Sequence, residues 1–197
     1  TKYFEDLFNS LPSMENKSVA ITGTTSGLGF YAAESVAKLG ARVLLLNRPS
    51  DRAETSYALL NDSCSSGDLH KVDCDLQSFE SVKSATSKIS EICTDGLDVL
   101  CNNAGVMALK DKATIDGFDV QMQTNHLSHF LLTKLCMPLL DKASQSYFHF
   151  RTMLLMPSII VKIQDYSKSG IPDPESLFEL LFSFRFETQN HRLLCWF

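Results

Sequence analysis

The sequence has no apolar run that approaches the roughly 20 residues needed to cross a membrane as a helix. The closest stretch, residues 153–163, is interrupted by Pro157 and Lys162. The first eleven residues contain Lys2, Glu5 and Asp6 and lack the apolar centre of a secretory signal. These absences predict a cytoplasmic protein without a transmembrane segment. They leave a plastid location and association with a membrane surface open.

An excess of positive charge is also absent. The 197 residues contain 18 Lys and Arg against 23 Asp and Glu, which gives a formal net charge of -5. This balance excludes a nucleic-acid binder that works through a basic surface. The six cysteines form no Cys-x-x-Cys pair and no metal-like spacing. We therefore expect buried thiols in a reducing compartment.

Glycine is nearly missing from the last quarter of the chain. Eight of the nine glycines lie in residues 1–145, and only Gly170 follows them. Residues 146–197 instead hold seven of the 13 phenylalanines and the single tryptophan. This contrast predicts two parts, a nucleotide-binding domain over 1–145 and an atypical, aberrant or poorly ordered segment over 146–197.

Strands and helices alternate through the first part. The pattern predicts strands at 17–22, 42–46, 69–74 and 97–101, and helices at 30–39, 51–60, 78–93 and 118–140. Asp51 is the expected cap of the second helix, with Glu54 at capping-box distance, and Pro138 is expected to stop or kink the last. After Ala143 the alternation fails, and residues 147–151 show only weak strand character. The order predicts an α/β fold with a Rossmann-like, doubly wound parallel sheet that is incomplete at its C-terminal end.

A glycine-rich turn separates the first strand from the first helix. Glycines stand at Gly23, Gly27 and Gly29. Glycine lets the backbone turn tightly and approach a diphosphate, while the following helix N-terminus offers N–H groups and a positive dipole end. Because the strand and the helix flank this turn in the required order, it predicts nucleotide binding.

The segment from Thr22 to Gly29 resembles the Thr-Gly-x-x-x-Gly-x-Gly motif of the short-chain dehydrogenase/reductase family. Three further segments match that family in order: Asp75-Leu76, the Asn-Asn-Ala-Gly motif at 102–105, and residues 125–133. The last is similar to the Asn-His-Leu-Gly-His-Phe-Leu-Leu-Thr motif of retinol dehydrogenases and protochlorophyllide reductase, with Ser128 in place of glycine. The resemblance covers about residues 15–143.

The resemblance implies a set of cofactor-binding residues. In the family, the Asp after the third strand meets the adenine, and the Asn of the long helix sits at a helix distortion and positions a proton-relay water. The resemblance therefore implies a catalytic role for Asn125. His126 and His129 share a helical face, but no third ligand accompanies them, so no metal site is predicted. The implied cofactor-binding residues are Gly23, Thr25, Ser26, Gly27, Leu28, Gly29, Arg48, Asp75, Leu76, Asn102, Ala104 and Gly105.

Cofactor choice follows from charge after the second strand. Sites that prefer NAD place a carboxylate there to bind the ribose 2′-hydroxyl. This chain has Asn47 and Arg48 instead, with Arg52 close behind. The absence of a carboxylate and the planar donor of Arg48 predict NADP. The alternative is that Arg48 is a solvated surface side chain.

The family's catalytic pair is not found. Its members use a Tyr as general acid/base, with a Lys four residues later that lowers the Tyr pKa, and a Ser upstream that binds the reacting oxygen. None of the five tyrosines here has Lys at that spacing. Tyr166 lies at about the right distance from Asn125, but Lys168 follows at +2, on the opposite helix face. Tyr166 is therefore either catalytic or a loop tyrosine.

Two hypotheses follow for the whole chain. The first is an NADP-dependent oxidoreductase that acts on a small-molecule alcohol or carbonyl, with no nucleic-acid partner and with a homo-oligomer allowed by the helix at 118–140. The second is a truncated or frame-shifted, non-catalytic nucleotide-binding fragment of such an enzyme. A dinucleotide-binding regulatory module is a third interpretation.

Overall fold

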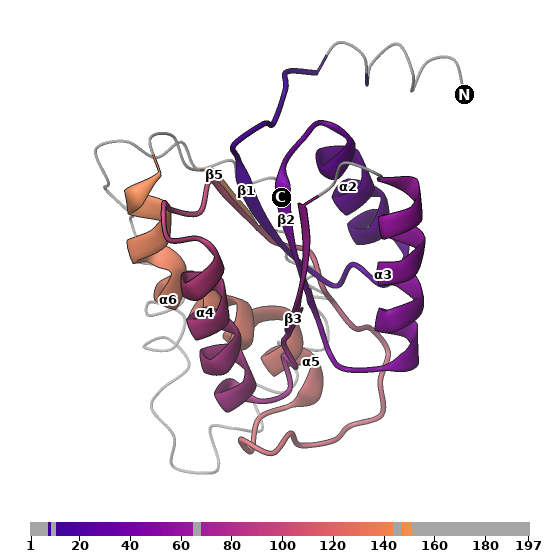
Figure 1. The fold of residues 1–197 in the computed structure, drawn as a ribbon. Helices are drawn as coiled ribbons and strands as arrows, with labels where there is room; N and C mark the ends of the chain where they lie inside the picture. The colour runs from indigo at the N-terminus through magenta and orange to yellow at the C-terminus, as the bar shows by residue number, and fades with distance from the viewer. Residues whose placement is uncertain (1–7, 9–10, 65–67, 144–146, 151–197) are drawn as a thin grey trace. The chain divides into compact units, whose positions relative to one another are not determined.

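A sheet of parallel strands forms the centre of the computed structural model, which describes residue 8, residues 11–64 and 68–143, and the backbone of 147–150. Every paired strand in this part is parallel to its neighbour, and the order is β3-β2-β1-β4-β5 (Figure 1). The chain reverses its direction of travel across the sheet between β1 and β4, which makes their carboxyl ends the switch point where ligands bind in such folds. The strands are β1 (Ser18–Thr22), β2 (Arg42–Asn47), β3 (Asp68–Asp73), β4 (Val99–Asn102) and β5 (Tyr147–Phe150).

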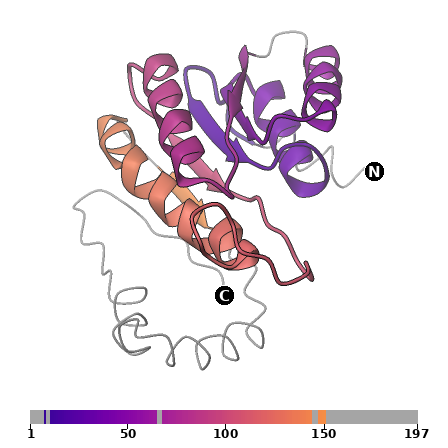
Figure 2. The same cartoon turned by 90° about the horizontal axis from the view of Figure 1, so that it is seen from below.

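Helices cover both faces of the sheet. Helices α2 and α3 pack against each other on one face, and α4 and α6 pack against each other on the other face (Figure 2). The predicted Rossmann-like, doubly wound α/β class is confirmed for the described part of the chain. The helices are α2 (Gly27–Lys38), α3 (Asp51–Ser63), α4 (Phe79–Ile92), α5 (Val120–Met122), the π-helical turn η1 (Gln123–Leu127) and α6 (Ser128–Lys142).

Strand β2 shows how the sequence fills both layers of the core. Its side chains alternate between faces, as the two-residue period of a strand requires. Val43 and Leu45 join the apolar cluster under α2 and α3, while Leu44 and Leu46 join the cluster under α4 and α6. All four are at most 2% exposed. Burial of each side chain contributes about 1.5–3 kcal/mol, so the continuous apolar run encodes a strand covered on both sides.

The predicted cap of the second helix is wrong by one residue. Ser50, not Asp51, has extended backbone angles, and its side chain accepts a hydrogen bond from the Ala53 N–H. Asp51 and Glu54 instead lie in the first turn of α3. Both residue types can cap a helix, and carboxylates inside the first turn interact favourably with the helix dipole.

The last helix does not stop at Pro138, so of the predicted stop or kink the stop is wrong and the kink stays a prediction. Helix α6 continues past Pro138 to Lys142, and the helical segment starts at Val120 rather than at residue 118. The missing N–H of Pro138 is offset by its surroundings: Leu139 and Leu140 are buried, and the Leu139 carbonyl accepts a hydrogen bond from the Leu97 N–H. Packing against the sheet therefore holds the helix together beyond the proline.

The weak strand character at 147–151 corresponds to strand β5, whose backbone pairs with β4. Residues 151–197, including the candidate catalytic Tyr166, lie outside the described part. Among the described cysteines, all are free thiols, and four of the five are buried as expected. Burial raises the pKa of the Cys74 and Cys136 thiols to about 12, so both stay protonated near neutral pH. No described helix is both long enough and apolar enough to span a membrane.

Candidate cofactor-binding site

The glycine-rich turn after β1 leaves no space for side chains at two of its glycines. Gly23 has a φ of +71°, and a Cβ there would lie 2.9 Å from the Cα of Ala104. A Cβ on Gly29 would overlap the Gly23 carbonyl oxygen and the Asn103 side chain. The turn is thus packed directly against the segment that follows β4. Glycine lets two backbones approach this closely, and a glycine turn of this kind is typical of dinucleotide-binding sites.

Thr22 and Asn103 hold these two segments together. The Thr22 hydroxyl oxygen accepts hydrogen bonds from the N–H groups of Asn103 and Ala104, each at 3.0 Å. The Asn103 amide donates to the Thr22 and Gly23 carbonyls at 2.9 and 3.2 Å. Neither residue is among the predicted site residues, although both lie inside the quoted motifs. Both residues bond to the backbone of the neighbouring segment and so fix the shape of the site. A motif that identifies residues by their contacts with a ligand does not single them out.

The N-terminus of α2 differs from those of α3 and α4. Ser50 and Ser78 cap α3 and α4 with their side chains, whereas the Ser26 side chain makes no cap hydrogen bond to α2. Its hydroxyl oxygen instead accepts a hydrogen bond of 2.6 Å from Arg52 Nη2. The first turn of α2 contains no acidic residue. An end of this kind, directly after a tight glycine turn, suits an anionic group.

The carboxyl end of β2 faces the same turn. Asn47 and Thr24 bond reciprocally, since Asn47 Oδ1 accepts from the Thr24 N–H at 2.8 Å and Asn47 Nδ2 donates to the Thr24 hydroxyl at 2.7 Å. Arg48 follows and is exposed. Arg52, in the first turn of α3, donates a hydrogen bond to the Ser26 hydroxyl. The structure therefore brings a second arginine to the candidate site, which the sequence placed only nearby. The feature of the sequence that could have indicated a role for Arg52 is its position four residues after Arg48.

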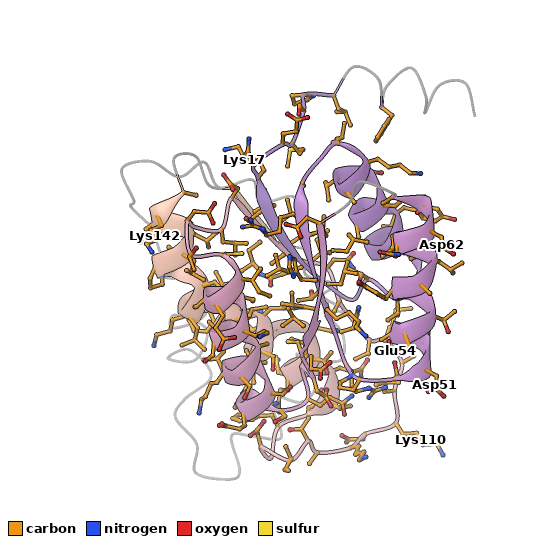
Figure 3. All side chains as sticks on the ribbon, viewed as in Figure 1. Lys17, Asp51, Glu54, Asp62, Lys110 and Lys142 are labelled. Atoms are coloured by element: carbon orange, nitrogen blue, oxygen red, sulfur yellow. The ribbon has the colours of Figure 1, made fainter. Side chains whose placement is uncertain are left out.

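Figure 3 orients this end of the molecule. Asp51, at the start of α3, and Lys110, in the loop after β4, lie at the end of the sheet where the strands finish. Lys17, before β1, and Lys142, at the end of α6, mark the opposite end. The glycine turn, residues 102–105 and the start of α3 thus share the carboxyl edge of the sheet.

Asp75 and Leu76 follow β3 in a tight local arrangement. Asp75 Oδ1 accepts a hydrogen bond from the Gln77 N–H at 2.9 Å, and the Asp75 N–H donates to Ser81 Oγ at 2.8 Å. Leu76 is buried, and its carbonyl accepts the Ser128 hydroxyl at 2.6 Å. The serine that replaces the family's glycine therefore joins the start of α6 to this segment. Asp75 remains half-buried, and its contact with adenine stays a prediction.

Asn125 lies in the π-helical turn η1, at a helix distortion like the one that the resemblance implies. Its side chain holds the segment after residues 102–105 by two hydrogen bonds. Oδ1 accepts from the Val106 N–H, and Nδ2 donates to the Val106 carbonyl, each at 2.8 Å. A Cβ on Gly105 would lie 3.5 Å from Asn125 Oδ1. Asn125 therefore fixes the backbone that directly follows residues 102–105.

The loop before the π-helical turn is tied down by Asp116. Its Oδ2 accepts hydrogen bonds from the Phe79 N–H at the start of α4, at 2.8 Å, and from Gln123 Nε2 at 2.6 Å. Gln123 is fully buried, and its Oε1 accepts the Thr114 hydroxyl. Phe79 and Phe118 also contact through their rings. One carboxylate thus joins the loop, α4 and η1.

Replacement of Asp116 by alanine is expected to lower the free energy of unfolding by about 1–3 kcal/mol, because Gln123 loses a partner in a buried position. Urea denaturation measures the change. Asp62→Ala, at an exposed position near the end of α3, is the matched control and should change stability by less than about 0.5 kcal/mol. Equal stabilities of the two variants would contradict the role of Asp116.

The described residues offer no metal site, since no three His, Cys, Asp or Glu side chains gather to hold an ion. The structure brings together the glycine turn, residues 102–105 and Asn125. Arg52 reaches the turn through Ser26, and Arg48 directly follows Asn47 in the chain. A parallel sheet with this strand order, a glycine turn at its switch point and an uncapped helix behind it defines a Rossmann-like α/β fold of the dinucleotide-binding type.

Comparison with known proteins identifies the family. The family model described as short chain dehydrogenase matches residues 17–147, and the chain belongs to this family. Mouse retinol dehydrogenase 14 is 38% identical over 143 residues, and human retinol dehydrogenase 13 is 34% identical over 137 residues. These alignments cover 68% and 70% of this chain but only 42% and 40% of the relatives. The chain therefore spans well under half the length of these curated relatives.

Solved structures show the same fold. A protein from Mycobacterium paratuberculosis is 37% identical with a TM-score of 0.59, and the match covers 67% of this chain and 46% of that one. A short chain dehydrogenase from Escherichia coli CFT073, solved in complex with NADPH, is 26% identical with a TM-score of 0.57. That match covers 68% of this chain and 57% of the other.

Proposed function

We propose that residues 1–145 form an NADP(H)-binding domain of an oxidoreductase that transfers a hydride between NADP(H) and an alcohol or carbonyl substrate. The observation that carries the proposal is the glycine turn, in which Gly23 and Gly29 lie too close to residues 103–104 to accommodate a Cβ. Family membership and the NADPH complex of the Escherichia coli relative support it. Apart from the candidate catalytic Tyr166, residues 146–197 are assigned no function.

Different residues of the site would bind different parts of the cofactor. The turn from Gly23 to Gly29 and the N-terminus of α2 would hold the pyrophosphate through backbone N–H groups. Asp75 and Leu76 would meet the adenine, and residues 102–105 would line the nicotinamide side. When bound, the nicotinamide ring supplies or accepts the hydride. Asn125 keeps this last segment in place through its two bonds to Val106.

The preference for NADP depends on the two arginines. A ribose 2′-phosphate at the end of β2 would meet Arg48, which is exposed and next to Asn47 in the sequence. Arg52 Nη2 already lies 2.6 Å from Ser26 Oγ in the turn. Guanidinium groups bind phosphate through planar paired donors. Neither Asn47 nor Arg48 carries a carboxylate that would repel the phosphate.

Arg48→Gln and Arg52→Gln are each expected to weaken NADPH binding about tenfold to a hundredfold, since a hydrogen bond to a charged group contributes about 1.5–3 kcal/mol. NADH affinity should change by less than about threefold, because NADH lacks the 2′-phosphate. Fluorescence titration with each nucleotide measures both effects. Lys88→Gln, on the exposed face of α4, removes the same charge and should leave both affinities unchanged. An equal loss of NADPH and NADH affinity in the arginine variants would contradict the assignment.

The substrate is proposed to be apolar. Retinol dehydrogenases are among the relatives, and the loop after the 102–105 segment exposes Met107, Leu109, Ile115 and Phe118. Asn125 and Tyr166 are the proposed catalytic residues. NADPH oxidation with aldehydes and ketones, measured for the wild type and for Tyr166→Phe, tests this. Turnover that is lost in Tyr166→Phe supports a catalytic tyrosine, and turnover that survives contradicts it.

The second candidate is a non-catalytic nucleotide-binding fragment. It is favoured by the sequence, in which no tyrosine has a lysine four residues later, and by the family match, which extends only to residue 147. Genomic sequence across codons 140–150 tests this alternative. A one-base change or an intron boundary that restores Ser and Tyr-x-x-x-Lys downstream would support it. An intact frame together with turnover would contradict it.

A further inference from the structure

One buried histidine contacts two segments of the candidate site that are far apart in sequence. His129, in the first turn of α6, has no exposed surface. Its Nε2 lies 3.0 Å from the Thr22 hydroxyl at the end of β1, and its Nδ1 lies 3.2 Å from the Asn125 carbonyl in η1. Neither contact is explained by the cofactor-binding residues that the family motifs imply.

The partners of the ring determine where its hydrogen lies. The Asn125 carbonyl can only accept, so Nδ1 must carry the hydrogen. Burial lowers the pKa of His129 to about 4, and the ring is therefore neutral near pH 7. In the neutral ring Nε2 is then an acceptor.

Thr22 is a matching donor. Its oxygen already accepts two hydrogen bonds, from the N–H groups of Asn103 and Ala104, and so both of its lone pairs are used. Its own hydrogen remains to be donated. The Cys101 carbonyl lies at 3.5 Å and His129 Nε2 at 3.0 Å, which makes the histidine the closer acceptor. Donation to His129 leaves the lone pairs of Thr22 aimed at the 103–104 segment.

We propose that His129 is a positioning residue that joins the cofactor-binding turn, through Thr22, to the π-helical turn that carries Asn125, as a neutral ring with its hydrogen on Nδ1. The proposal rests on the proposed nucleotide-binding function for its effect on affinity. His129 itself is buried, and in this proposal it does not contact the cofactor but acts through Thr22 and Asn125. Loss of its Nε2 acceptor frees the Thr22 hydroxyl to rotate, which loosens the contact between the glycine turn and residues 103–104.

Two conservative variants separate the contacts of the ring. Asparagine can place an N–H near the position of Nδ1, so His129→Asn keeps a donor for Asn125 and loses the acceptor for Thr22. Glutamine can place an oxygen near the position of Nε2, so His129→Gln keeps the acceptor. NADPH affinity is expected to fall about tenfold in His129→Asn and to return to within about threefold of the wild type in His129→Gln. A merely space-filling role would not distinguish the two. Wild-type affinity in both variants, or equal loss in both, would overturn the proposal.

The hydrogen position is tested without any nucleotide. Nitrogen-15 NMR of the full chain at pH 7 should show His129 with a hydrogen on Nδ1 and an unprotonated Nε2. A protonated Nε2 would overturn the assignment. The wild-type chain is titrated with NADPH in the same series. If it does not bind, the proposed function fails, and the NMR spectrum alone then decides whether His129 joins Thr22 and Asn125 as described.

Discussion

Gly29→Ala is expected to weaken NADPH binding about tenfold to a hundredfold. Alanine is a better helix former than glycine by about 1 kcal/mol, so helix propensity at this position in α2 favours the substitution. The steric effect opposes it, because the new methyl group would overlap the Gly23 carbonyl and the Asn103 amide. These atoms belong to a turn and to an amide with two hydrogen bonds, and they cannot yield as a flexible side chain does. Overpacking costs about 1–3 kcal/mol, which equals or exceeds the propensity gain. Relief of the overlap moves the turn, and a lost hydrogen bond from the turn to a charged phosphate costs about 1.5–3 kcal/mol, or about tenfold to a hundredfold in affinity.

The control for Gly29→Ala is a glycine with open space around it. Gly117 has a φ of +83°, and no atom lies within 4 Å of its ideal Cβ position. Gly117→Ala should therefore show only the backbone cost of a left-handed residue, about 1–2 kcal/mol of stability, with unchanged affinity for NADPH. Isothermal titration measures the affinities, and urea denaturation measures the stabilities. Wild-type NADPH binding by Gly29→Ala would contradict the proposal that the shape of this turn determines cofactor affinity.

Acidification is expected to destabilise the protein through His129. Burial lowers the pKa of this histidine in the folded chain to about 4, against 6.5 for the ordinary group, and the hydrogen bond to Asn125 opposes part of that shift. The folded state therefore favours the neutral ring. The contribution of neutral His129 to the free energy of unfolding is complete above about pH 6.5 and is lost as the pH falls from there to about 4. The shift corresponds to about 3 kcal/mol.

Denaturation of the wild type and of His129→Asn at several pH values between 7.5 and 4 tests this window. The free energy of unfolding should fall more steeply in the wild type, by about 3 kcal/mol over the whole range. Burial also lowers the pKa of the neighbouring His126, which titrates in the same direction in both proteins. Asp68, whose pKa lies below its ordinary value of 3.8, adds its loss only at lower pH. Parallel slopes for the two proteins would contradict the burial of a neutral His129.

The strands and the glycine turn could be predicted because their signals are local. A run such as Val43–Leu46 is apolar on every residue, and only a strand covered on both faces buries it completely. The cap of α3 was misplaced by one residue because Ser50 and Asp51 are both good caps, and only the backbone angles separate them. The path of α6 through Pro138 depends on burial of Leu139 and Leu140, which the sequence does not reveal.

The supporting contacts of the site could not be predicted in the same way. Arg52 and Ser26 are 26 positions apart, and Thr22 and His129 are 107 apart. No sequence period brings such pairs together, since they meet only after the sheet has formed and α6 has packed on it. The motifs predict which residues line the site, and the structure adds residues such as Thr22 and Asn103, which hold these segments together. The role of Tyr166 stays a prediction, because it lies outside the described residues.

A paired titration of the purified chain with NADPH and NADH tests the central claim most directly. The arrangement of the glycine turn, Arg48 and Arg52 predicts that NADPH binds and that NADH binds at least about tenfold more weakly. Absence of binding for both nucleotides would contradict the nucleotide-binding function. Equal affinities, or a preference for NADH, would contradict the assignment of the arginines to the 2′-phosphate.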